Sequence, residues 1–111
     1  MSATITRDEL RALIDAGEVT VVEALPPMYY DDAHLPGAVR LNHDEVTERH
    51  AEVLGDTEAQ IVTYCSNLQC QNSHSVAEQL RALGYVNVRR YAEGKDDWVA
   101  AGLPVVSSAR A

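Results

Sequence analysis

The sequence predicts an α/β domain built on a mostly parallel β-sheet. Short apolar runs alternate with helical patterns along the 111 residues, which is typical of βαβ units. The length suits one compact domain with its own core. Hydrophobic residues make up 46% of the chain and charged residues 23%, the usual balance of a globular protein. We expect one domain over residues 4–105 and a frayed tail over residues 106–111.

The first predicted helix begins with a capping box. Thr6 stands three residues before Glu9, and apolar residues recur at helical spacing until Gly17 ends the pattern. A β-branched strand follows at residues 19–22, and the two prolines at 26–27 are expected to break regular structure. The later elements are predicted as a helical turn at 29–32, a strand at 39–41, a helix at 44–54, a strand at 61–64, a helix at 73–83, a strand at 86–89 and a short helix at 96–101.

The start of the helix at residues 73–83 has three candidate caps. Asn72 or Ser73 would cap it alone, whereas Ser75 would form a capping box with Glu78. Gly84 follows the helix at the position where glycine commonly ends one.

The charge of the chain disfavours several classes of partner. Asp and Glu number 17 against 9 Lys and Arg, which gives a net charge of -8. Nucleic acids and anionic membrane surfaces are therefore disfavoured. No apolar run approaches membrane-spanning length, and the first residues do not read as a signal peptide, so we expect a cytoplasmic protein. The sequence does not indicate an oligomeric state.

Cys65 is the residue most suggestive of chemistry. It follows the buried strand at 61–64, opens a polar loop over residues 66–72, and precedes a helix. We expect its thiol at the loop mouth, beyond the carboxyl end of a strand, where ligands bind in parallel sheets. Loop N–H groups and the helix dipole there would favour thiolate over thiol. This order predicts nucleophilic chemistry at sulfur.

Several motifs occur in the order found in one enzyme family. They are His-Leu-Pro-Gly-Ala at 34–38, Tyr-Cys at 64–65, Gly-Tyr at 84–85, Gly94 followed by Trp98, and Ala-Gly-Leu-Pro-Val at 101–105. With these motifs the chain resembles the single-domain rhodaneses from about residue 4 to residue 105. The resemblance implies a five-stranded parallel sheet with helices on both faces.

The resemblance also implies sulfur transfer through a persulfide on Cys65. The acceptor would be a thiol or cyanide, and the donor thiosulfate or a small-molecule or protein-bound persulfide, with no metal and no cofactor. The loop that would cradle the persulfide comprises Ser66, Asn67, Leu68, Gln69, Cys70, Gln71, Asn72 and Ser73.

Three departures from the family pattern affect this expectation. The loop is about two residues longer than usual and contains no Arg or Lys, so weak use of thiosulfate is expected, and an oxyanion reductase or phosphatase is disfavoured. Glu23 stands where many members have an Asp-x-Arg pair. The usual Gly-Gly pair is reduced to Gly94-Lys95.

Cys70 has three possible roles: a resolving thiol that closes a disulfide with Cys65, an incidental loop residue, or the main nucleophile. A zinc site formed by both cysteines and His74 is disfavoured. The runner-up to the enzyme is a non-catalytic, rhodanese-like module that binds a partner protein or senses redox state through the two cysteines.

Other polar and aromatic residues have mainly structural interpretations. We expect a ring nitrogen of His34 to bond nearby backbone, and His74 to be exposed. Tyr91 and Trp98 are expected in the core or at its rim. Arg89 or Arg90, at the end of a strand, would partly replace the missing loop arginine if it approached the loop.

Overall fold

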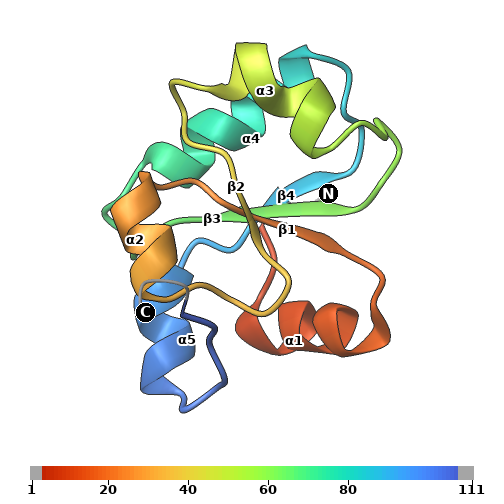
Figure 1. The fold of residues 1–111 in the computed structure, drawn as a ribbon. Coiled ribbons are helices and arrows are strands. Elements are labelled where there is room, and N and C mark those ends of the chain that lie inside the picture. Colours follow the sequence, from red (N-terminus) through yellow and green to blue (C-terminus); the bar gives the residue numbers. More distant parts are fainter. Residues whose placement is uncertain (1–3, 108–111) are drawn as a thin grey trace.

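The computed structural model describes residues 4–107 and has the predicted α/β architecture (Figure 1). Helices and strands alternate through this part of the chain. Their bounds are α1 Arg7–Ala16, β1 Thr20–Glu23, α2 Pro27–Asp32, β2 Val39–Arg40, α3 Val46–Val53, β3 Ile61–Tyr64, α4 Asn72–Ala82, β4 Val88–Arg90 and α5 Gly94–Ala100.

The sheet of the described residues has four strands, so the implied fifth strand is a wrong expectation. The order is β2-β1-β3-β4, and every pairing is parallel. Among the described N-terminal residues, Thr4 forms a bridge to Arg90, and the Ile5 N–H donates to the Arg90 carbonyl at 3.0 Å. Pairing stops there because Thr6 already caps α1.

Helices cover both faces of the sheet, as expected. Figure 1 shows α3 and α4 on one face and α1 and α5 on the other. Successive side chains of a strand point to opposite faces, so Val22 and Ile61 join one core cluster, whereas Val21 and Val62 join the other. Three of the buried aromatics, Tyr64, Tyr91 and Trp98, lie in the cluster beneath α1 and α5, and Tyr85 lies in the other cluster.

The ends of the elements confirm some local predictions and correct others. The Thr6–Glu9 capping box is present. Pro27 begins α2 rather than breaking it, because a proline fits the first helical position, where no N–H bond is needed. All three candidate caps of α4 are wrong: Gln71 holds the cap position, and its side chain makes no capping bond. Helix α5 begins two residues earlier than predicted, at Gly94.

The C-terminal segment is held by backbone pairing up to Val106. The N–H groups of His34 and Val106 each donate to the other residue's carbonyl, at 2.9 and 2.8 Å. The Ser107 hydroxyl donates to the Asp31 carbonyl at 3.2 Å. Residues 108–111 of the predicted tail lie outside the described residues. No helix within residues 4–107 combines the length and apolar character needed to cross a membrane.

Glu45 ties the edge strand β2 to the start of α3. Arg40 donates to both carboxylate oxygens, at 2.5 and 3.0 Å, and the Asn42 N–H donates to Oε1 at 3.1 Å. Arg49 Nη1 lies 3.4 Å from Oε2. These bonds, led by that from Arg40, lower the pKa of Glu45 to about 2.

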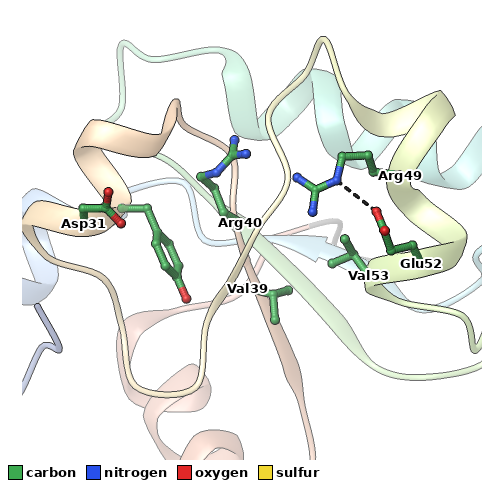
Figure 2. Close-up of a pocket in the computed structure, with 7 residues that line it drawn as sticks. Asp31, Val39, Arg40, Arg49, Glu52 and Val53 are labelled. Carbon is green, nitrogen blue, oxygen red and sulfur yellow. Dashed lines mark hydrogen bonds and ion pairs between the residues drawn. The ribbon is translucent and has the colours of Figure 1, made fainter. Parts of the chain in front are cut away.

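A groove of about 590 Å³ opens beside this cluster (Figure 2). Arg49 is paired with Glu52 at 3.1 Å along its wall. None of the residues expected to form the sulfur-transfer site lines the groove. Its lining residues are Tyr30, Asp31, Val39, Arg40, Arg49, Glu52 and Val53.

The Glu45 carboxylate should make the free energy of unfolding depend on pH in the acid range. Its pKa is lower in the folded state than its ordinary 4.5, so its contribution is present above pH 4.5 and is lost as the pH falls toward 2. We expect Glu45→Gln to cost about 2 kcal/mol at pH 6, a value reduced for solvent screening of a side chain that is 25% exposed. The difference from wild type should vanish near pH 2 in urea unfolding.

A matched control is Glu52→Gln, because the Glu52 side chain is 70% exposed. Its difference from wild type should stay within about 0.5 kcal/mol at every pH. If the loss of stability in Glu45→Gln relative to wild type is constant from pH 6 to pH 2, the role given to Glu45 is contradicted.

Candidate functional site

Cys65 lies at the topological switch point of the sheet. It directly follows β3, and the chain leads from β1 to β2 on one side and from β3 to β4 on the other. Ligands of open parallel sheets bind at this crevice. The thiol is not at an open loop mouth as expected, however, because only 1% of the residue is exposed. Any reagent must therefore pass the loop to reach the sulfur.

The Cys65 sulfur has three hydrogen-bonding partners. The Cys70 carbonyl and the Ser73 hydroxyl each lie 3.2 Å from Sγ, and the Ser73 N–H donates to Sγ at 3.4 Å. Burial and the Cys70 side chain raise the pKa of the thiol, and the two Ser73 groups offset only part of that effect. The expectation that converging loop amides favour the thiolate is therefore wrong, since Ser73 supplies the one amide bond to Sγ within residues 4–107.

The loop docks on the start of α5 through its carbonyl groups. The Lys95 N–H donates to the Cys65 carbonyl at 2.8 Å, and the Asp96 N–H donates to the Ser66 carbonyl at 2.9 Å. Asn67 shapes the turn, since its side chain accepts from the Gln69 N–H at 3.1 Å and donates to Asp96 at 3.2 Å. The first turn of α5 thus binds loop carbonyls and is not available to an anion.

Arg90 is the cation that reaches the loop. Its Nε donates to the Ser73 hydroxyl at 2.7 Å, and its Nη2 donates to the Cys70 carbonyl at 2.9 Å. Arg89 instead lies 3.4 Å from the Gln60 side chain. Of the two arginines proposed from the sequence to approach the loop, the structure selects Arg90.

Two departures from the family pattern are physically linked. Glu23 is completely buried, and Lys95 Nζ lies 3.1 Å from its carboxylate. The Tyr64 hydroxyl donates to the same carboxylate at 2.6 Å and accepts from the Leu35 N–H at 3.0 Å. Lys95 Nζ also donates to the Tyr29 carbonyl at 2.9 Å. Both departures were noted from the sequence, but their pairing was not predicted. The available signal was that the two unusual residues carry opposite charges.

The other predicted site residues differ in their exposure to solvent. Ser73 is buried beside Cys65, whereas Leu68, Gln69 and Gln71 are exposed. The intermediate positions are Ser66, Asn67, Cys70 and Asn72. Cys70 is a free thiol, as is Cys65, and its backbone carbonyl meets the Cys65 sulfur.

The histidines behave as predicted. His34 Nδ1 lies 2.8 Å from the Tyr30 carbonyl, and the two rings stack with centroids 3.8 Å apart. His74 is exposed on α4. Among residues 4–107, no three His, Cys, Asp or Glu side chains are arranged to hold a metal ion.

Comparison with known proteins identifies the family. The model of the rhodanese-like domain matches residues 6–101, nearly the whole chain. The chain belongs to the rhodanese-like domain family. The parallel sheet and its covering helices are therefore those of a rhodanese-like fold, with four strands in the described residues.

One curated relative and two solved structures are similar to this chain. The HTH-type transcriptional regulator Rv0324 of Mycobacterium tuberculosis is 39% identical over 101 residues, which span 91% of this chain but only 43% of the regulator. The crystal structure of the BH2092 protein from Bacillus halodurans superposes with a TM-score of 0.88 at 23% identity, over 96% of this chain and 78% of that one. The human single-domain sulfurtransferase TSTD1 superposes with a TM-score of 0.77 at 19% identity, over 90% and 97%.

Gly94 should be essential for docking the loop on α5. It has a φ of +73°, and a Cβ there would lie 2.6 Å from the Cys65 carbonyl oxygen and 2.9 Å from the Asn67 nitrogen. We expect Gly94→Ala to destabilise the fold by about 2–4 kcal/mol, because backbone strain and overpacking add. Chemical denaturation measures this loss.

Gly102→Ala is the matched control for this substitution. Gly102 has a φ of +76° but nothing within 4 Å of the added Cβ, so only the backbone strain applies. Its cost should be about 1 kcal/mol. Equal losses in the two variants would show that the contact with the loop contributes nothing.

Proposed function

We propose that this chain is a sulfurtransferase that carries sulfane sulfur on Cys65. The Cys65 thiolate attacks the outer sulfur of a donor, the donor S–S bond breaks, and the electron pair leaves with the remainder of the donor. A persulfide remains on Cys65. An acceptor thiolate or cyanide then attacks the terminal sulfur, takes it as a persulfide or thiocyanate, and regenerates the Cys65 thiolate.

The observation that carries the proposal is the placement of the Cys65 sulfur. It lies at the switch point of a rhodanese-like sheet, with the N–H and hydroxyl groups of Ser73 within 3.4 Å. Both groups are able to donate to a sulfur anion that forms there. This arrangement supports nucleophilic chemistry at Cys65.

The burial of Cys65 adds two requirements to the proposal. With 1% of the residue exposed, the loop must shift to admit the donor sulfur. The pKa of the resting thiol is raised, so the reactive thiolate fraction, and with it the rate of persulfide formation, should increase as the pH rises.

A second candidate is a redox-sensing or protein-binding module. One observation favours a non-catalytic module in general: the buried thiol has a raised pKa, which lowers its reactive thiolate fraction. Another favours a regulatory role: a relative that is 39% identical is described as a transcriptional regulator. In this case Cys65 would respond to oxidation, with Cys70 as its partner, rather than turn over sulfur.

The first test concerns the nucleophile. Cys65→Ser should abolish the gain of one sulfur that intact mass reports after incubation with a sulfane-sulfur donor. The fold should lose no more than about 1 kcal/mol, because a serine hydroxyl fits the same space and retains the polar partners Cys70 and Ser73. Cys70→Ser, measured in parallel under reducing conditions, should still gain the sulfur.

The outcomes separate the candidates. Loading of Cys65→Ser at the wild-type rate would reject Cys65 as the nucleophile. A wild-type chain that gains no sulfur from any donor while both thiols stay intact would favour the sensing module.

The second test concerns the donor. Residues 66–73 contain no Arg or Lys, and the chain has a net charge of -8, so a dianionic donor should bind poorly. We expect kcat/KM for thiosulfate to be at least about tenfold below that for a low-charge organic persulfide, because a missing charge-assisted hydrogen bond costs about 1.5 kcal/mol or more. A preference for thiosulfate would show that Arg90 or backbone amides bind the donor anion.

A further inference from the structure

Arg90 is a partly buried cation without a carboxylate partner in the described chain. Within residues 4–107, Arg90 takes part in no ion pair with Asp or Glu. Its guanidinium instead donates to the Ser73 hydroxyl at 2.7 Å and to the Cys70 carbonyl at 2.9 Å. A positive charge is thus held at the loop with only neutral partners.

These two neutral groups are also the partners of the Cys65 sulfur. Each lies 3.2 Å from Sγ. The Ser73 oxygen accepts from Arg90, which leaves its own proton free to point toward Sγ. The Cys70 carbonyl, already bound by Arg90, becomes a weaker acceptor for the thiol proton. Both effects favour the anionic form of the sulfur.

We infer that Arg90 is a positioning residue that stabilises the Cys65 thiolate by orienting the Ser73 hydroxyl and binding the Cys70 carbonyl. The inference deepens the proposed sulfur transfer, on which it rests, because the same contacts would serve each time the acceptor step restores the thiolate. It also means that Arg90, at the end of β4, takes the place of the arginine that the loop lacks.

Other charged and titratable groups around Cys65 are differently placed. Lys95 of α5 is neutralised by Glu23 of β1, and Asp96 of α5 bonds the Asn67 side chain. His74 of α4 is exposed, and Cys70 is the nearby second thiol. Arg90 therefore supplies the unneutralised positive charge at this end of the described sheet.

The test measures the pH dependence of Cys65 alkylation by iodoacetamide, a neutral reagent. All variants carry Cys70→Ser, which leaves one thiol and preserves the carbonyl of residue 70. Arg90→Gln is compared with Arg89→Gln, which removes the same charge from the adjacent residue. Arg89 is a suitable control because its side chain bonds Gln60 and not the loop. Thermal unfolding of each variant verifies the fold.

We expect the apparent pKa of Cys65 to rise by about one unit in Arg90→Gln. The thiolate fraction at pH 7 then falls about tenfold, and alkylation slows about threefold relative to the parent because the remaining thiolate is more nucleophilic. Above both pKa values it should react up to about threefold faster, because a more basic thiolate is more nucleophilic. Arg90→Lys keeps the charge but cannot donate to two groups as a guanidinium does, so its rate of alkylation should lie between those of the parent and Arg90→Gln. Arg89→Gln should match the parent at every pH.

Three results would overturn the inference. Superimposable profiles for Arg90→Gln and Arg89→Gln would show no specific effect of Arg90. Faster alkylation of Arg90→Gln at every pH would mean that Arg90 only keeps the loop closed. Slowing confined to anionic iodoacetate would make Arg90 a docking residue for anions. Sulfur loading of the wild type is measured separately, so failure of the proposed function is distinguishable from failure of this inference.

Discussion

The buried carboxylate of Glu23 is the interaction on which the site depends. It ends β1, accepts from Tyr64 at the end of β3, and pairs with Lys95 in the first turn of α5. Removing one partner of such a pair leaves an uncompensated buried charge, which typically costs about 3–5 kcal/mol. The pair therefore fixes α5 against the carboxyl end of the sheet, where the loop after Cys65 must dock.

The position of α5 then determines the environment of the sulfur. Its first turn binds the carbonyls of Cys65 and Ser66, and among the described residues the Ser73 amide is the one that bonds Sγ. The loop carbonyl of Cys70 contacts the sulfur instead, while burial and the Cys70 side chain raise the pKa of the thiol. A thiol protected in this way suits a carrier that exposes its sulfur only when the loop moves.

Local physics explains what could be predicted from the sequence. The capping box at Thr6, the β-branched strand at 61–64 and the position of Cys65 after it depend on neighbouring residues and on hydrophobic periodicity. The order of short motifs was enough to indicate the rhodanese-like family. The fifth strand was not a local prediction but was implied by the resemblance, and residues 4–107 form a sheet of four strands.

Sequence alone thus determined the α/β class, the elements and the candidate nucleophile. Only the tertiary structure decided that Cys65 is buried, that Glu23 pairs with Lys95 across 72 positions, and that Arg90 rather than Arg89 reaches the loop. These contacts join segments distant in the chain, and alternate residues of a strand face opposite sides of the sheet. Their partners depend on strand order and helix docking, which no local pattern specifies.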